Sequence, residues 1–380
     1  MKRVQSIGTK LILLVILGLT ACGTQSEEPL ESSASESSQV SSSEESSSSE
    51  VESSSQEPVE SIYTIEDFFP NTDNLYYEYT GEGIEYAGFW EHTVYSNENR
   101  KQYSRNNGGT EVAEVVALQD DQLVILYHEG ETYYRENLLE KSNETIEILL
   151  QGPFEIGTNW EIPDGRTKTI TGLEVPVTTE LAEYETLEVT TEWDNGLAVV
   201  VDYYAPEIGL VKSIYTDTDD EGFEVTTEIQ SITETPFEQT IRFYYPNFES
   251  EQVEYIDKTL QMNTNDSTKD AIETAYKETP EGLTPVLTEN VEINTLYLND
   301  DGRVYVDFSQ ELIDEMNAGS LAEMLIVESL VNTIGNYYGV TEVYLTVDGN
   351  PYQTGHIEKQ EGEFFQVNME ETQEYQPVEE

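Results

Sequence analysis

Short runs of alternating apolar and polar residues fill the chain from Ile62 to Thr235, and they constrain the fold more than any other feature. Alternation from Leu187 to Trp193, the turn residues Asp-Asn-Gly and a second run from Leu197 to Tyr204 predict a β-hairpin. We therefore expect residues 62–235 to form an antiparallel β domain with an aromatic-rich core. Further strand-like runs lie at Val112–Leu118, Leu123–Tyr134, Tyr203–Ile214 and Val225–Ile232, and the tryptophans are Trp90, Trp160 and Trp193.

The first residues indicate export. Lys2, Arg3 and Lys10 accompany an apolar stretch from Leu11 to Leu19, which is typical of a signal peptide. The following Leu-Thr-Ala-Cys resembles the lipobox of bacterial lipoproteins, which implies that residues 1–21 are removed and that Cys22 carries lipid such as palmitate. An ordinary secreted start and a short membrane anchor are the alternatives. Because Cys22 is the sole cysteine, an internal disulfide and a thiolate zinc site are excluded.

Residues 22–61 are predicted to be a disordered tether. This Ser- and Glu-rich segment has no Lys or Arg and almost no large apolar side chain, so it cannot bury enough surface to offset chain entropy. The whole chain has 77 acidic and 17 basic residues, and removing Lys2, Arg3 and Lys10 changes its formal charge from -60 to -63. Such a field repels nucleic acid and attracts cations, amines or basic proteins. Adaptation to an ion-rich exterior is the alternative explanation.

Strands and helices alternate in the last part of the chain, residues 239–368, and residues 369–380 are predicted to be a disordered acidic tail. Ser267 and Asp270 fit a capping box at the start of a helix over residues 267–277. The runs 296–298 and 303–308, joined by Asn-Asp-Asp-Gly, predict a hairpin. Ser309 can cap a short helix after it, and alternation over 343–347 predicts the last strand.

A longer helix is predicted from Ser320, because Ser320 and Glu323 fit a second capping box and Gly339 can end the helix. At 100° per residue its apolar side chains share one face. Ser329, Asn332 and Asn336 are then expected on the opposite side, where Asn332 can bond the backbone of a neighbouring loop without being catalytic. The apolar face consists of Ile326, Val327, Leu330, Val331, Ile334 and Tyr337.

Several motifs between Gln239 and Val367 resemble the GerMN domain of sporulation, germination and other envelope proteins of Gram-positive bacteria. They are Gly282–Leu287, Arg303–Ser309, Gly319–Ile334, Gly339–Gly349 and Gly355–Glu358. The resemblance implies an α/β sandwich-like fold related to ring-building modules, with no established enzymatic activity. Germination members carry the domain twice and this chain carries one copy, so oligomerisation stays open. The matching polar, glycine and histidine positions, expected to be structural or to bind a partner, are Asp307, Ser309, Glu323, Ser329, Asn332, Thr333, Asp348, Gly349 and His356.

Two segments of the β domain resemble extracytoplasmic β-sheet lipoproteins of Gram-positive bacteria. They begin with Gly-Pro-Phe-Glu-Ile-Gly at residue 152 and with Tyr-Tyr-Ala-Pro-Glu at residue 203. Some of these lipoproteins have curved sheets that hold apolar ligands. The resemblance therefore implies a second class of function, in which the β domain binds an apolar ligand or peptide. A large apolar pocket lined by Tyr and Trp side chains would favour it.

Enzyme and metal motifs are weak. The histidines, His92, His128 and His356, are dispersed, and His-Glu-Gly-Glu-Thr at residue 128 has Thr132 where a zinc motif needs its second histidine. A hydrolase has no identifiable nucleophile and base, so we expect no enzyme and no cofactor. Residues 217–228 mimic a calcium loop but have strand-like flanks, which favours a hairpin turn. The calcium ligands of this minor hypothesis would be Asp217, Asp219, Glu221 and Glu228.

The sequence thus predicts an α+β protein: an antiparallel all-β domain followed by an α/β GerMN-like domain, after a disordered tether. We expect a lipoprotein held by Cys22 on the extracytoplasmic face of a Gram-positive cell membrane, acting by protein binding or scaffolding on an unidentified envelope protein. Exposed aromatic or apolar residues should then form a contiguous patch on the GerMN-like domain. Tyr337 and Tyr338 are candidates for it, unless they are buried.

Overall fold

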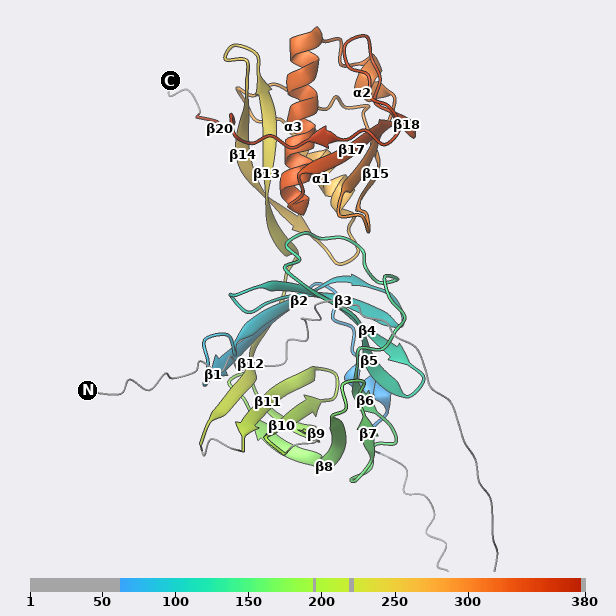
Figure 1. The fold of residues 1–380 in the computed structure, drawn as a ribbon. Helices are drawn as coiled ribbons and strands as arrows, with labels where there is room; N and C mark the ends of the chain where they lie inside the picture. The colour runs from blue at the N-terminus through green and yellow to red at the C-terminus, as the bar shows by residue number, and fades with distance from the viewer. Residues whose placement is uncertain (1–61, 194–195, 219–221, 377–380) are drawn as a thin grey trace, which may run out of the picture. The chain divides into compact units, whose positions relative to one another are not determined.

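Strands β1 to β12 form one antiparallel sheet, as the alternating pattern predicts (Figure 1). In the computed structural model, which describes residues 62–193, 196–218 and 222–376, the strand order is β6-β5-β4-β3-β2-β1-β12-β11-β10-β9-β8-β7. A short 3-10 helix, Ile65–Phe68, precedes it. The strands are β1 Leu75–Glu82, β2 Phe89–Ser96, β3 Arg100–Asn106, β4 Glu111–Gln119, β5 Gln122–Gly130, β6 Glu147–Gln151, β7 Asn159–Glu161, β8 Thr167–Thr178, β9 Glu183–Glu192, β10 Ala198–Ala205, β11 Gly209–Asp217 and β12 Glu224–Glu234.

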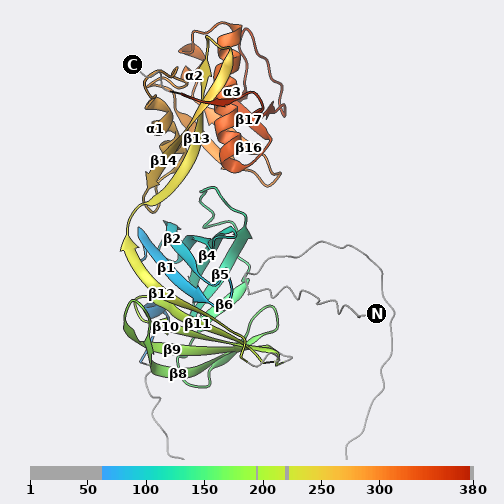
Figure 2. The same cartoon turned by 90° about the vertical axis from the view of Figure 1, so that its left-hand side faces the viewer.

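This sheet curls until its two edge strands meet (Figures 1 and 2). Register shifts typical of β-bulges interrupt six of its strand pairs, for example between Thr93 and Tyr95 on β2, and a bulge increases the local twist. The edges are joined by a side chain, because Trp160 Nε1 on β7 donates to the Ile148 carbonyl oxygen on β6 over 3.1 Å. Buried residues from β4 and β5 pack with buried residues from β8 and β9 inside the curve. The sheet is therefore almost a closed barrel with a packed interior.

The sheet divides one predicted strand in two and contains one predicted hairpin. Residues 203–214, predicted as one run, are divided between β10 and β11 by a tight turn that includes Glu207 with a positive φ of 65°. The predicted hairpin over 187–204 is confirmed, since β9 and β10 pair antiparallel on either side of residues 194–195, which lie outside the described residues. The local alternation was thus interpreted correctly, but it did not reveal the turn.

The remaining elements build the GerMN-like part in two sheets and three helices (Figure 1). A hairpin of β13 and β14 is followed by a mixed sheet of β15, β16, β17 and β18, in which β16 and β17 are parallel. No helix among the described residues is long and apolar enough to cross a membrane. The bounds are β13 Phe237–Asn247, β14 Gln252–Met262, α1 Thr268–Lys277, β15 Ile293–Leu298, β16 Val304–Phe308, α2 Glu311–Asp314, α3 Ser320–Tyr338, β17 Glu342–Val347, β18 Asn350–Pro351, β19 Phe365–Gln366 and β20 Gln373–Glu374.

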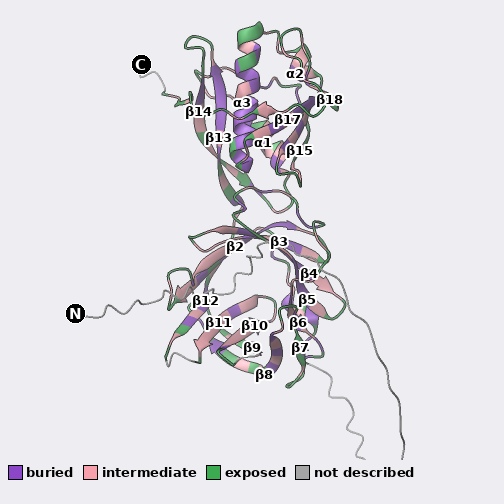
Figure 3. Cartoon of the chain, in the orientation of Figure 1, coloured by how far each residue is buried: buried purple, intermediate pink, exposed green. Residues whose placement is uncertain are grey.

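Helix α3 lies between the β13–β14 hairpin and the mixed sheet, and it is buried along most of its length (Figures 1 and 3). All six residues of the predicted apolar face are buried. Of the residues predicted on the opposite side, Asn336 is exposed, but Ser329 and Asn332 have no exposed surface. Tyr337 and Tyr338 are buried too, so they cannot form an exposed patch. A helix that is covered on nearly all sides needs an internal partner for each polar side chain.

The C-terminal segment departs from the expected disordered tail. Gln373 and Glu374 form β20, which pairs in parallel with Glu254 and Tyr255 of β14. The backbone N–H of Tyr375 extends this ladder by donating to the Tyr255 carbonyl oxygen over 2.9 Å. Acidic composition alone suggested disorder, but the free edge of β14 supplies backbone partners for this segment.

Arg135 connects the 12-stranded sheet to the GerMN-like part within the compact unit that begins at Tyr63. It lies in the long connection between β5 and β6 and is almost fully buried. Its guanidinium donates from Nη2 to the carbonyl oxygens of Val94 on β2, over 2.8 Å, and Asn263 after β14, over 3.0 Å. It also stacks on Tyr95, with 4.1 Å between the guanidinium carbon and the ring centroid.

The backbone of Arg135 is held as firmly as its side chain. Its N–H donates to the Tyr337 hydroxyl on α3 over 2.7 Å, and its carbonyl accepts from Thr268 Oγ1 over 2.8 Å. Burial lowers the pKa of Arg135 from its ordinary value, but an arginine this basic keeps its proton. One charged side chain therefore bonds carbonyl oxygens of β2 and of the chain after β14, and no local sequence pattern marks it.

We predict that Arg135→Met lowers the free energy of unfolding by about 3 kcal/mol, because it removes the charged hydrogen bonds to the carbonyl oxygens of Val94, Asn263 and Asp266. All three tryptophans lie in or beside the 12-stranded sheet, whereas the long helices lie beyond it. Tryptophan fluorescence and far-ultraviolet circular dichroism should then give separate unfolding transitions in urea. The half-exposed Arg242, which pairs with Asp257, is the control, and Arg242→Met should cost below about 1 kcal/mol. Coincident, unshifted transitions in Arg135→Met would contradict the role of Arg135.

Candidate functional site

Three motif residues, Ser329, Asn332 and Thr333, are polar side chains in the middle of the apolar helix α3. Each has no exposed surface. Ser329 Oγ donates to the carbonyl oxygen of Leu325, one turn earlier in the same helix, over 2.7 Å. This bond satisfies the Ser329 hydroxyl inside the helix and leaves it without a base that could activate it.

Thr333 completes the edge of a β-strand. Tyr244 lies on β13, and its backbone N–H and C=O point away from the partner strand β14. The N–H donates to Thr333 Oγ1 over 2.9 Å, and the Tyr244 carbonyl accepts from the hydroxyl of Tyr276, on α1, over 3.2 Å. The Tyr276 hydroxyl also contacts Thr333 Oγ1 and lies 3.0 Å from the Ser329 carbonyl oxygen, so its single proton is shared between the two carbonyls. Two side-chain hydroxyls thus supply the hydrogen-bond partners that a neighbouring strand would otherwise give to the backbone of Tyr244 on the buried edge of β13.

Asn332 holds the chain after β19. Its amide nitrogen Nδ2 donates to the Asn368 carbonyl oxygen over 2.6 Å, and its Oδ1 accepts from the Asn368 N–H over 2.8 Å. Gly335, one turn further on, leaves room for this segment, because a Cβ there would lie 2.2 Å from Val367 Cγ2. Asn332 therefore bonds the backbone of a neighbouring segment, as expected, but from a buried position.

Glu323 does not belong to a capping box. Gly319 is the N-cap of α3 and no side chain caps the helix there. The buried Glu323 carboxylate instead accepts from the Tyr352 hydroxyl over 3.0 Å and from Thr354 Oγ1 over 2.5 Å. Thr354 Oγ1 in turn accepts from the backbone N–H of His356, whose side chain is exposed in a turn. The helix is thereby bonded to the chain that follows β18.

Asp307, Asp348 and Gly349 build the turn between β17 and β18. Asp348 and Gly349 have positive φ angles of 47° and 74°, which a two-residue hairpin of the primed type requires. Asp307 Oδ1 accepts from the Gly349 N–H over 2.8 Å and from Thr346 Oγ1 over 2.6 Å. Ser309 does not cap α2, whose N-cap is Gln310. Its hydroxyl accepts from the Glu292 N–H over 3.1 Å, next to β15.

The nine motif residues therefore do not converge on one reactive centre. Seven of them bond their side chains or their N–H groups to residues elsewhere in the domain, and none brings a hydroxyl together with an imidazole. No group of three or more His, Cys, Asp or Glu side chains in the described parts of the chain could hold a metal ion. This arrangement positions backbone segments relative to one another.

Residues 242–353 match the sequence signature of the Germane family, described as "Sporulation and spore germination". The protein contains a GerMN domain. The tandem GerMN domains of the sporulation protein GerM from Bacillus subtilis are similar to 37% of this chain, with 20% identity and a TM-score of 0.27. This chain spans about half of that structure, 48%. No curated protein matches the sequence.

Two further solved structures are similar to parts of the chain. The first GerMN domain of GerM from Bacillus subtilis is covered over 85% of its length and matches 30% of this chain, with 23% identity and a TM-score of 0.24. A protein from Parabacteroides distasonis, described as a candidate lipoprotein, is covered over 98% of its length and matches 44% of this chain, with 13% identity and a TM-score of 0.25.

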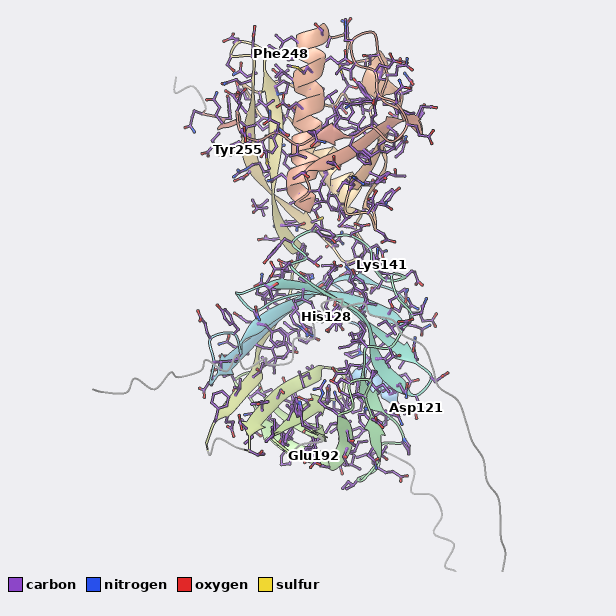
Figure 4. The ribbon with its side chains drawn as sticks, in the orientation of Figure 1. Asp121, His128, Lys141, Glu192, Phe248 and Tyr255 are labelled. Atoms are coloured by element: carbon purple, nitrogen blue, oxygen red, sulfur yellow. The ribbon has the colours of Figure 1, made fainter. Side chains whose placement is uncertain are left out.

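Outside the GerMN domain, His128 lies on the inner side of the curled sheet (Figure 4) and belongs to an ion network, not to a zinc site. Its Nδ1 is 3.1 Å from Glu114 Oε2, and Arg105 Nη2 is 3.3 Å from Glu114 Oε1. Burial opposes ionisation of Glu114, but Arg105 and His128 hold the pKa of its carboxyl below its ordinary value. Thr132 is engaged elsewhere, with its Oγ1 donating to the Glu129 carbonyl oxygen over 3.1 Å.

The cavity beside Arg135 does not fit an apolar ligand. It measures about 10 Å³, enough for a single water molecule, and polar side chains such as Gln102, Ser104 and Thr132 share its lining with Tyr134. His92 is buried between carbonyl oxygens of Thr93 and Thr235. The large pocket that the ligand-binding hypothesis needs is therefore not this one.

Two of the four candidate calcium ligands, Asp217 and Glu228, lie in the described part of the chain. Asp219 and Glu221 lie outside the described residues, as does the lipidation candidate Cys22. Asp217 ends β11, and Glu228 lies on β12 with its carboxylate 2.8 Å from Lys212 Nζ. The two strands form the expected hairpin, in which the Asp217 N–H donates to the Phe223 carbonyl oxygen over 3.1 Å. Calcium binding stays a prediction.

We predict that Thr333→Val, a change of nearly equal volume, lowers the free energy of unfolding by about 1–3 kcal/mol, because it leaves the buried Tyr244 N–H without an acceptor. Urea denaturation measures the change. Thr240→Val is the matched control on the same strand, since its hydroxyl bonds an exposed neighbour, Thr259, and it should change stability by less than about 0.5 kcal/mol. Equal losses in the two variants would show that Thr333 does not complete the edge of β13.

A second prediction concerns Asn332. Asn332→Ala removes both hydrogen bonds to Asn368, so hydrogen exchange in a peptide covering residues 365–376 should become at least about tenfold faster. Asn336→Ala is the control, because Asn336 faces the same segment with only a weak bond to Met369 Sδ, 3.4 Å long. Unchanged exchange in Asn332→Ala, measured by mass spectrometry, would exclude Asn332 as the anchor of this segment.

Proposed function

We propose that the protein is a lipid-anchored envelope protein on the extracytoplasmic face of a Gram-positive cell, where its GerMN domain acts by binding another protein. The observation that carries this proposal is that the polar motif residues form hydrogen bonds inside the domain. Ser329, Asn332 and Thr333 are consumed in holding backbone together, so the motif preserves a shape and does not supply reactive groups. A domain whose buried polar residues hold its backbone in one arrangement presents a constant surface, which is suited to binding another protein.

The anchor and the charge support the same function. A lipid on Cys22 and an acidic segment from residue 23 to residue 61 would hold the folded part near the membrane but free to reach a partner. The Germane description suggests that such a partner belongs to sporulation or germination. With 77 acidic against 17 basic residues, the protein would favour a partner with positive charge and reject nucleic acid.

We predict that Cys22→Ser abolishes incorporation of radiolabelled palmitate and releases the protein from the membrane fraction into the medium, because no other cysteine is present to carry the lipid. Cell fractionation and autoradiography measure both effects. Ser26→Ala, a change four residues further along, is the control and should leave label and membrane retention unchanged. Wild-type protein recovered unlabelled from the medium would contradict the anchor.

Partner binding is tested by crosslinking the intact, anchored protein on living cells with an amine-reactive reagent and identifying what is attached. Recovery of one envelope protein in stoichiometric amount is the expected result. Recovery of no protein, together with a lipid that co-purifies with the chain, would replace protein binding by ligand binding in the β domain.

A further inference from the structure

Four aromatic side chains line the side of the mixed sheet that faces away from α3. Tyr297 on β15, Tyr305 on β16 and Tyr344 on β17 are paired in register across the three strands. Ring centroids are 5.6 Å apart for Tyr297 and Tyr305 and 5.1 Å apart for Tyr305 and Tyr344. Phe364, from the connection before β19, adds a fourth ring 5.3 Å from Tyr344. We call these four residues the aromatic strip.

The aromatic strip is not part of the hydrophobic core. The intervening residues Val304, Val306 and Leu345 point to the other side and pack with α3, as alternation along a strand requires. Tyr297 keeps 39% of its surface exposed, and the other three rings are half-buried against one another. Tyrosine is enriched at protein interfaces, since it offers a large apolar ring and a polar tip at a small cost in conformational entropy.

Carboxylates surround the aromatic strip. Asp301 Oδ2 accepts from the Tyr305 hydroxyl over 3.0 Å, and Glu342 lies beside Tyr344 on the same face of β17. The exposed Glu361 and Glu363 flank Gly362, whose N–H donates to the Tyr344 hydroxyl over 3.4 Å. The charge at this surface is therefore mostly negative, in line with the formal charge of -60 for the whole chain.

One cation already shows how a positive group fits here. The guanidinium carbon of Arg303 lies 4.6 Å from the centroid of the Phe364 ring. Its Nε donates to Glu342 over 2.6 Å, and its Nη1 is 3.5 Å from Asp301. A guanidinium or ammonium group over an aromatic face, held by carboxylates at the edge, gains from both interactions. Tyr297, at the far end of the strip, has a more exposed ring.

We propose that the aromatic strip is the docking surface for a basic, Lys- or Arg-containing segment of a partner protein. This inference rests on the proposed function, and it adds the place and the chemistry of the contact. Charge complementarity selects the partner: rings bind its apolar stems and cationic heads, and Asp301, Glu361 and Glu363 attract it over a distance that salt shortens.

The test begins with the whole chain, purified in mild detergent, and a random dodecapeptide library displayed on phage. The expected result is enrichment of peptides rich in Lys and Arg. The most enriched peptide is then titrated by fluorescence anisotropy against the variants. Its dissociation constant should rise at least about tenfold in Tyr297→Ala and in the double variant Glu361→Lys/Glu363→Lys, and the affinity should fall as salt is raised.

Two controls separate docking from damage to the fold. Tyr86→Ala removes a tyrosine of the β domain that is even more exposed, at 48%, and should leave the affinity unchanged. The double charge variant changes only exposed side chains. It therefore still tests the docking surface if Tyr297→Ala lowers the unfolding midpoint. Enrichment of peptides without basic residues, or equal affinity in all variants, would overturn the proposal.

A glycan is the competing occupant of an aromatic surface. A soluble hexamer of β-1,4-linked N-acetylglucosamine is therefore titrated in parallel, and binding that is lost in Tyr297→Ala would also overturn the proposal. A partner crosslinked on cells with unchanged yield in both strip variants would leave the proposed function intact and reject this surface. Failure of the surface and failure of the function are thus distinguishable.

Discussion

The GerMN domain depends on one constraint: the outer edge of β13 is buried, and its backbone groups must find partners other than a strand. A buried N–H or C=O group without a partner costs about 1–3 kcal/mol. Thr333 and Tyr276 supply the hydroxyls that satisfy Tyr244, one from α3 and the other from α1. Because both helices must keep these hydroxyls at hydrogen-bonding distance, the bonds also fix how the helices lie against the hairpin.

The same constraint explains why a helix as apolar as α3 contains polar residues at its centre. Leu330, Val331 and Ile334 fill the core and could be exchanged for other apolar residues of similar volume. Asn332 and Thr333 could not, because each faces a specific backbone group, in one case 36 residues away and in the other 89 residues away. Polar positions therefore specify the arrangement of segments, and apolar positions supply the driving force.

Local pattern predicted much of the fold from the sequence. The hairpins around residues 194–196 and 299–302, the cap of α1 at Ser267 and the apolar face of α3 are all present. What local pattern could not supply was the partner of a polar side chain. Ser320 and Glu323 have the spacing of a capping box, yet Glu323 bonds Tyr352 and Thr354, which no short window contains. For the same reason Ser329 and Asn332 could be placed opposite the apolar face, but the segments that cover them could not be predicted.

Arg135 is the clearest case of information that lies outside the local sequence. It directly follows the predicted strand-like run Leu123–Tyr134, and nothing in the nearby sequence marks it as buried. Its acceptors come from β2 and from the chain after β14, and its N–H meets Tyr337 more than 200 residues later. A buried arginine with neutral oxygen partners can be recognised only once the strands have been paired, since only then do its acceptors lie close together.

Acidic residues occupy part of one edge of the mixed sheet. Most carboxylates are solvated, but Glu273 accepts from the Ile293 N–H over 2.7 Å and Glu136 accepts from the Leu298 N–H over 3.0 Å, at the two ends of β15. These amides on the free edge of the mixed sheet are thereby occupied, and a carboxylate in that position also repels an approaching strand edge. Helix α3 closes the edge of β13 in another way. With strand addition blocked at these places, a partner of the kind proposed above would have to bind the side chains on the outer face of β15, β16 and β17 instead of their backbone.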